Sequence, residues 1–283
     1  DFQNRYYESF PIGTAAQEIL STKNLNKNKT FYIYVGGFKS HIAKESTDKI
    51  KNAFKSIPNS YLIIVDHKAY TNDMDGPKCS YERSVKFVPS IGKKIAEMLN
   101  ALTKNLVLPK NIHCIGHSLG GQILGYVGKN FEELTKQKIS RITALDPAGP
   151  CFVGKSNYHI RSGVAKYIEI YHCNAGVLGS DKSLGDVNFI VDKGKYLSEC
   201  GRPSSSLNLM QAWDAAKCSH KKCLMIWTAS ILHKSWFPAY KCDKYKNFQQ
   251  CKNSWKDKTT AGFWNPGNAT GTYYFSTDGY NLQ

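Results

Sequence analysis

The sequence predicts an α/β fold with a mostly parallel central sheet flanked by helices. Two stretches are predicted helices, one of them with clear amphipathic spacing, and five short apolar runs are typical of buried strands: 31–35, 61–65, 111–115, 141–145 and 167–172. Strands that alternate with helices along a chain form βαβ units, whose strands lie parallel in one sheet.

The first predicted helix, 84–102 (SVKFVPSIGKKIAEMLNAL), lies between the second and third apolar runs. Its apolar residues recur at three- and four-residue spacing, which places them on one helix face: Val88, Ile91, Ile95, Met98, Leu99 and Leu102. The second helix is predicted over 122–134. From about residue 200 the alternation weakens, and we expect loops and peripheral elements of the same domain there.

Composition indicates a globular protein that meets anionic partners. The 283 residues are 41% hydrophobic and 21% charged, and no apolar run is long enough to span a membrane. The net charge is +16, which attracts anionic lipid surfaces, although a solvated lysine-rich surface explains it as well. The basic residues are scattered without an arginine-rich or aromatic-interleaved run, so we expect no nucleic-acid partner.

Cysteine content and sequons favour secretion. The chain has nine cysteines and two Asn-x-Thr sequons, at Asn28 and Asn268, which are candidate glycosylation sites. It starts without Met or an apolar leader, so we expect that a signal peptide has been removed. An odd number of cysteines leaves at least one thiol without an intramolecular partner.

The segment GHSLG places Ser118 between Gly116 and Gly120. A strand-like run precedes it and a helix-like stretch follows it. In that context the G-x-S-x-G pattern predicts a strained turn that exposes the serine hydroxyl above the sheet. Ser118 is therefore the candidate nucleophile, and a glycine-rich strand-to-helix turn without catalysis is the alternative.

A nucleophilic serine needs a histidine base and a carboxylate that orients the base. Asp146 follows the run 141–145 and precedes Pro147, as expected for an acid at the carboxyl end of a strand. An ordinary turn before Pro147 is the alternative interpretation.

Several histidines compete for the role of base. The spacing gives a modest preference to His220, in CSHKKC, which we expect in a loop held by neighbouring cysteines; the others considered are His113, His117, His159, His172 and His233. A zinc site formed by Cys218, His220 and Cys223 is conceivable, but its spacing is unusual for structural zinc. We expect neither a metal nor an organic cofactor.

Several segments together resemble the pancreatic lipase family over roughly residues 30 to 278. They are GHSLGG, ALDPAGP, YHCNAGVLG with GDVNF, CSH and the closing GTYYFST. The resemblance implies an α/β-hydrolase catalytic domain with Ser118 as nucleophile, Asp146 as acid and His220 as base. It also implies an oxyanion hole formed by the backbone N–H groups of Phe38 and Leu119.

The chain departs from the family pattern in several places. Members typically read HGF where this chain has Gly36, Gly37 and Phe38, which alters the oxyanion segment. The chain also departs from the pattern at four positions whose role the sequence does not indicate: Gly121, Cys151, Cys173 and Cys223. The family's C-terminal lipid-binding β-sandwich is not found in residues 1–283, so we expect one catalytic domain, similar to short insect members such as venom phospholipases A1.

By the same resemblance, Cys200 and Cys218 are the pair that brackets the family's lid, and Cys242 and Cys251 form a second local pair. The bracketed segment could fold as a short amphipathic cover through Leu207, Leu209, Met210 and Trp213, or it could be an ordinary surface loop. The resemblance associates short lids with phospholipases. Five cysteines stay unassigned: Cys79, Cys114, Cys151, Cys173 and Cys223.

These observations predict a secreted serine hydrolase that cleaves acyl esters at a lipid or phospholipid interface, most simply as a phospholipase A1. Two alternatives stay open. One is a catalytically silent binding or storage protein of the yolk type, which the retained triad positions argue against. The other is a triglyceride lipase or a carboxylesterase. The sequence does not predict acyl preference or oligomeric state.

Overall fold

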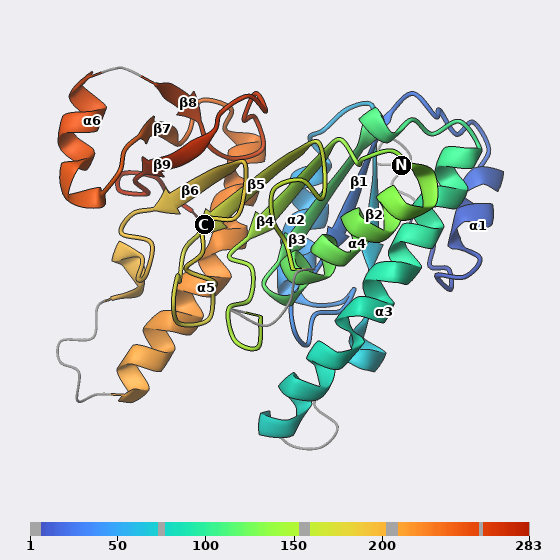
Figure 1. The fold of residues 1–283 in the computed structure, drawn as a ribbon, viewed down its shortest axis with the longest axis horizontal. Helices are drawn as coiled ribbons and strands as arrows, with labels where there is room; N and C mark the ends of the chain where they lie inside the picture. The colour runs from blue at the N-terminus through green and yellow to red at the C-terminus, as the bar shows by residue number, and fades with distance from the viewer. Residues whose placement is uncertain (1–6, 73–76, 153–158, 202–208, 255–256, 283) are drawn as a thin grey trace.

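A computed structural model describes residues 7–72, 77–152, 159–201, 209–254 and 257–282. The described residues form one nine-stranded sheet in the order β2-β1-β3-β4-β5-β6-β9-β7-β8 (Figure 1). All pairs are parallel except those that β7 makes with β8 and β9. The strands are β1 (Thr30–Val35), β2 (Ser60–Val65), β3 (Ile112–His117), β4 (Arg141–Leu145), β5 (Tyr167–His172), β6 (Val187–Val191), β7 (Pro238–Lys241), β8 (Lys258–Thr260) and β9 (Gly271–Phe275).

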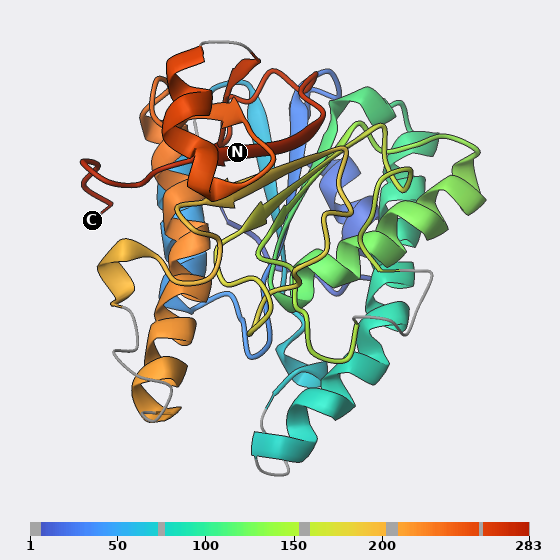
Figure 2. The ribbon, with the colours of Figure 1, turned by 60° about the vertical axis from the view of Figure 1, so that its left-hand side comes forward.

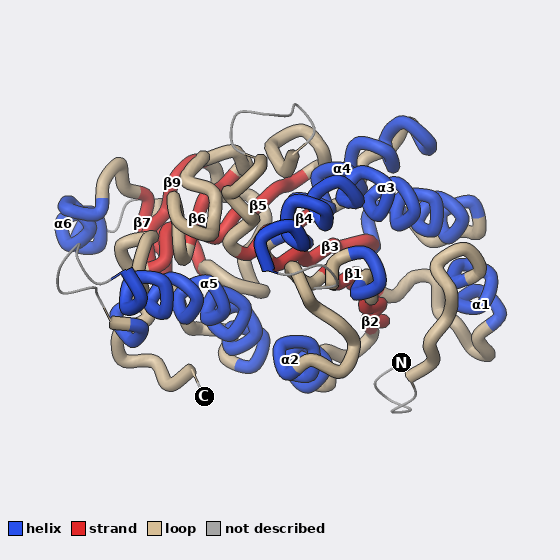
Figure 3. The backbone as a smooth tube through the Cα atoms, turned by 90° about the horizontal axis from the view of Figure 1, so that it is seen from below, coloured by secondary structure: helices blue, strands red, loops and turns tan. Residues whose placement is uncertain are grey.

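Helices cover both faces of this sheet. They are α1 (Ala15–Ser21), α2 (Glu45–Phe54), α3 (Pro77–Lys104), α4 (Leu119–Thr135), α5 (Leu209–Leu232) and α6 (Phe248–Ser254). Figure 3 shows α1, α3 and α4 on one side of the sheet and α2 and α5 on the other. The described helices include none that combines the length and the apolar character needed to cross a membrane.

The core is divided between these two faces. Side chains alternate along each strand, so Phe31, Ile33 and Val35 of β1 pack under α3 and α4, while Tyr34 packs toward α2 and α5. The predicted apolar face of α3 is buried from Val88 to Leu102. All five predicted strands and both predicted helices are confirmed, and so is the α/β fold class.

The prediction of loops after residue 200 is wrong. Residues 209–232 form the long helix α5, and β9 pairs in parallel with β6 inside the sheet. The helical spacing was hard to read because α5 buries small and polar side chains such as Ala215, Ala216 and Ser219 as well as large apolar ones. Figure 2 shows the first turns of α3 and α5 as two arms that project on the same side of the molecule.

Candidate active site

Ser118 lies at the turn between β3 and α4. Its φ of 55° and ψ of −120° are outside the usual regions for a residue with a side chain. The flanking glycines are required by close backbone approach: a Cβ on Gly120 would lie 2.0 Å from the Val35 carbonyl oxygen, and one on Gly116 would lie 2.6 Å from Gly120. The structure therefore contains the strand, turn and helix of a G-x-S-x-G turn. Ser118 is only 9% exposed, however, so it is less accessible than the pattern predicts.

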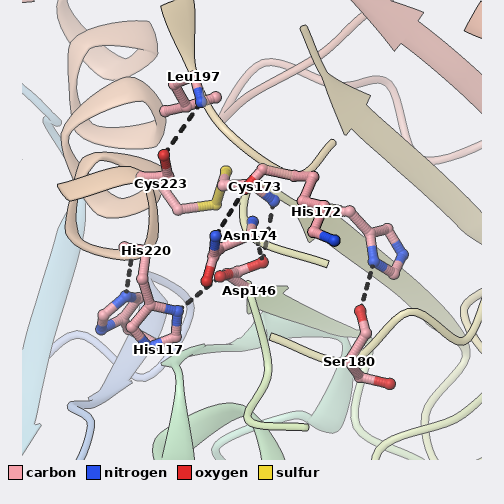
Figure 4. The surroundings of a disulfide bond; sticks show 11 residues. His117, Asp146, His172, Cys173, Asn174, Ser180, Leu197, His220 and Cys223 are labelled. Carbon is pink, nitrogen blue, oxygen red and sulfur yellow. Dashed lines mark hydrogen bonds and ion pairs between the residues drawn. A yellow bond between two sulfur atoms is a disulfide. The ribbon is translucent and has the colours of Figure 1, made fainter. Parts of the chain in front are cut away.

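Asp146 is fully buried directly after β4. Its Oδ2 lies 2.5 Å from His220 Nδ1, while its Oδ1 accepts the backbone N–H groups of Cys173 and Asn174 at 2.9 Å each (Figure 4). Burial by itself would raise the pKa of the Asp146 carboxyl, but the hydrogen bond and charge of His220 and the two N–H groups lower it below its ordinary value. The carboxylate is thus ionised and directed at the imidazole.

A second loop packs closely against the Asp146 carboxylate. A Cβ on Gly179 would lie 2.3 Å from Asp146 Oδ1, so no other residue fits at position 179 without displacing the acid. A side chain at position 121 is disfavoured for a similar reason, since a Cβ on Gly121 would lie 2.9 Å from Pro147 Cβ, in the loop after Asp146. The only indication of these two close contacts in the sequence is that Gly179 and Gly121 each lie in a segment with a candidate catalytic residue.

His220 lies on α5, not in the loop that the sequence analysis predicted. Its carbonyl oxygen accepts a hydrogen bond from His117 Nε2 at 2.9 Å, and the two ring centroids are 4.8 Å apart. Burial, and then the charge of His220, lower the pKa of His117 to about 3, so its ring is neutral and can donate to a carbonyl. Sequence reasoning assigned no role to His117, although it stands next to Ser118.

The structure brings Asp146 and His220 into contact and places Ser118 beside them. Two backbone hydrogen bonds join the turn at Ser118 to the loop that carries Asp146. The Ser118 N–H donates to the Leu145 carbonyl oxygen at 3.0 Å, and the Ala148 N–H donates to the Ser118 carbonyl oxygen at 3.1 Å. Within the described ranges, no hydrogen bond joins the Ser118 hydroxyl to His220. Such contacts are often long before substrate binds.

The segment Gly36–Phe38 passes next to the serine. A Cβ on Gly37 would lie 2.9 Å from Ser118 Cβ and 3.4 Å from Ser118 Oγ. Ser40 N–H donates to the Gly37 carbonyl at 3.0 Å, so the N–H of the same peptide unit, that of Phe38, points the opposite way. Leu119 is the first residue of α4, and the first N–H groups of a helix have no partner inside it.

Three disulfides are present among the described residues: Cys173–Cys223, Cys200–Cys218 and Cys242–Cys251. Cys114 is a buried free thiol and Cys151 an exposed one. The side chain of Cys79 lies outside the described part of the chain. The zinc alternative is wrong, because Cys218 and Cys223 are both in disulfides and have no thiolate to give a metal.

Residues 202–208 of the segment between Cys200 and Cys218 lie outside the described residues, and Leu207 is one of them. Residues 209–217 form the first turns of α5, and they carry three of the most exposed apolar side chains: Leu209, Met210 and Trp213. Both sequon asparagines, Asn28 and Asn268, are exposed.

Comparison with known proteins identifies the family of this chain. The profile of the family described as "Lipase" matches residues 2–260. The chain is 30% identical to "Phospholipase A1 VesT1.02" of Vespa tropica over 236 residues, which cover 82% of this chain and 75% of that protein. The chain belongs to the lipase family.

Two further relatives support this membership. "Phospholipase A1 4" of Polistes dominula is 32% identical over 78% of this chain and 68% of its own length. "Pancreatic triacylglycerol lipase" of Sus scrofa is 26% identical over 87% of this chain, and the match covers 55% of that protein, so the chain spans about half of its length. The predicted family is confirmed, and this lipase-family chain is a carboxylic ester hydrolase with an α/β-hydrolase fold.

Proposed function

We propose that this chain is a secreted phospholipase A1 that uses Ser118, His220 and Asp146 as a catalytic triad. The observation that carries the proposal is the 2.5 Å contact between the buried Asp146 carboxylate and His220 Nδ1, beside the serine turn. A carboxylate in this position keeps the proton on Nδ1 and leaves Nε2 free to act as a base. Three disulfides and two exposed sequons support a secreted protein.

In the proposed reaction the Ser118 hydroxyl oxygen attacks the acyl carbonyl while His220 Nε2 takes its proton. The Phe38 and Leu119 N–H groups donate to the oxyanion of the tetrahedral intermediate, and each donor lowers the barrier by about 3 kcal/mol. The ester C–O bond then breaks, and His220 returns the proton to the leaving alcohol oxygen. Water repeats the sequence on the acyl-serine and releases the fatty acid, so no cofactor takes part.

The preference for phospholipid rests on two further observations. Two wasp relatives with about 30% identity are named phospholipases A1. Positive charge also collects at the site: Lys44 Nζ donates to the Lys39 carbonyl at 3.2 Å, and burial together with the charges of Lys221 and Lys39 lowers the pKa of Lys44. These ammonium groups suit a lipid that carries a phosphate, which triglycerides lack.

Fatty-acid release from phosphatidylcholine vesicles, phosphatidylserine vesicles and triglyceride emulsions tests the proposal, with wild type beside Ser118→Ala. We expect release from both phospholipids, with the acyl chain removed from sn-1, and none from the variant. Release mainly from triglyceride would keep the mechanism and overturn the phospholipid assignment. Wild type that matches Ser118→Ala on every ester, including a small chromogenic one, would favour the silent binding protein.

A further inference from the structure

The altered oxyanion segment raises the question of what orients the Phe38 N–H in this chain. Gly36 stands where the family tripeptide has histidine, and it has no room for a side chain. A Cβ on Gly36 would lie 2.1 Å from Ser40 Oγ and 2.5 Å from Ser40 Cβ. Since Ser40 is itself buried, it cannot move aside into solvent.

A histidine from another segment contacts Gly36 instead. His67 follows β2, is 3% exposed, and lies with Nε2 2.9 Å from the Gly36 carbonyl oxygen. Because a carbonyl only accepts, His67 Nε2 carries the proton and donates it. Burial lowers the pKa of His67, so the ring is neutral. Its Nδ1 lies 2.7 Å from the hydroxyl oxygen of the fully buried Thr71, which also lies 3.2 Å from the His67 carbonyl oxygen.

The other end of the tripeptide is held by the same short segment. The Thr71 carbonyl accepts Lys39 N–H at 3.0 Å. The peptide unit that carries the Phe38 N–H therefore lies between two anchored points, the Gly36 carbonyl and the Lys39 N–H. Ser40 N–H fixes the carbonyl of that peptide unit from a third direction.

We propose that His67 is a positioning residue for the oxyanion hole: its ring, seated on Thr71, binds the Gly36 carbonyl and thereby aims the Phe38 N–H at the substrate oxyanion. This role rests on the proposed function. It accounts for how a tripeptide without histidine keeps its orientation, since the imidazole comes from the loop after β2. Hydrogen-bond donors stabilise a developing oxyanion most when they are already oriented toward it and need no rearrangement in the transition state.

The test compares His67→Phe, which keeps ring volume without a donor, with His67→Gln, which restores an N–H donor. His113→Phe is the matched control, because His113 is also a buried histidine, bonded to Thr143 at 2.7 Å at the start of β3. On a soluble chromogenic ester we expect His67→Phe to lose roughly ten- to a hundredfold in kcat with little change in KM. His67→Gln should recover most of that loss, and the control should keep its kcat.

Hydrogen exchange of the peptide covering residues 36–40 gives a readout independent of turnover. Protection there should fall in His67→Phe and stay unchanged in the control. Wild-type kcat in His67→Phe, or a His67→Gln variant no better than His67→Phe, would overturn the positioning role. If wild type hydrolyses no ester at all, the proposed function fails instead, and exchange alone decides: unchanged protection in His67→Phe then overturns the His67 contact as well.

Discussion

Cys173 and Cys223 form a disulfide that links the two segments holding the Asp146–His220 pair. Cys173 donates its backbone N–H to Asp146, and Cys223 lies one helical turn after His220 on α5 (Figure 4). The covalent link, the two intervening backbone segments and the Asp146–His220 contact close a ring. This disulfide uses two of the cysteines at which the chain departs from the family pattern.

Removal of this disulfide should therefore lower activity as well as stability. It joins residues 50 apart, so Cys173→Ala/Cys223→Ala should lose about 4 kcal/mol of unfolding free energy on chain-entropy grounds. We also expect kcat to fall roughly tenfold at a temperature where the variant is folded, because the imidazole loses its fixed place beside the acid.

The control for that experiment is Cys242→Ala/Cys251→Ala, whose disulfide closes a separation of 9 and joins the end of β7 to α6, elements that contribute neither Asp146 nor His220. It should lose about 2 to 3 kcal/mol of stability and no kcat. Chemical denaturation and turnover of a soluble ester measure the two effects. An equal kcat loss in both double variants would show that the Cys173–Cys223 disulfide contributes stability only.

Restoration of the family tripeptide should harm this chain. Gly36→His places a Cβ 2.1 Å from Ser40 Oγ, so residues 36–38 must shift away from Ser40, and the Phe38 N–H shifts with them. We expect at least a tenfold loss of kcat on a soluble ester, measured beside the exposed-glycine variant Gly13→His, for which a Cβ meets nothing within 4 Å. Full activity in Gly36→His would mean that the segment tolerates the side chain and that its present geometry is not required.

Acid should destabilise the protein partly through His117. The unfolded chain protonates this histidine near pH 6.5, while the folded pKa is about 3, so the unfolded state binds more protons between these values. Its contribution to stability is complete above pH 6.5 and is lost as the pH falls toward 3, by up to about 1.4 kcal/mol per pH unit. Urea unfolding at several pH values measures this slope.

His117→Gln removes the titrating group and keeps an amide donor for the His220 carbonyl. The pH slope of its unfolding free energy should be smaller than that of wild type. A slope remains, because His67 and His113 are also buried with lowered pKa values. Identical slopes in the two proteins would contradict the low folded pKa of His117.

The exposed start of α5 should bind lipid. Leu209 is 80% exposed, Met210 73% and Trp213 51%, and Lys217 follows one turn later. Such a surface inserts apolar side chains among acyl chains, and the Lys217 ammonium, paired with the Asp214 carboxylate at 2.8 Å, lies beside it. We expect Trp213→Ala to bind phosphatidylserine vesicles roughly tenfold more weakly and to hydrolyse a soluble ester normally.

Trp264→Ala is the control for vesicle binding, since Trp264 is also partly exposed but hydrogen-bonds Ile231 at the far end of α5. Co-sedimentation with vesicles measures binding for both variants. Equal losses in the two variants would show that the start of α5 has no special part in lipid contact.

The sequence predicted those parts of the fold in which the apolar period is regular. The five strand runs and the helices at 84–102 and 122–134 were all found, whereas α1, α2, β6, β7 and β8 were not predicted. Helix α5 was missed because cysteines, a histidine and small residues occupy its buried positions. Strand β9 was missed because it is short and pairs with β6, which lies some 80 residues earlier, so no local pattern reveals it.

For the site, chain order and motif context pointed to Ser118 and Asp146, the resemblance to the lipase family pointed to His220, and the structure places Asp146 and His220 in contact. The contacts that support them were beyond sequence reasoning, because each joins residues distant in the chain. His67 is 31 residues from Gly36, and His117 is 103 residues from His220. A single sequence contains no signal for such pairs other than the residue types themselves.

The measurement that tests the central claim most directly is covalent labelling by an alkyl fluorophosphonate, which reacts with serines activated by a histidine base and an oxyanion hole. Intact-mass and peptide analysis should find one phosphonyl group per chain, on Ser118. Ser118→Ala should take up none, and Asp146→Asn should react roughly a thousandfold more slowly. A wild-type chain that stays unlabelled, or that carries the label on another residue while Ser118→Ala reacts normally, would contradict the account.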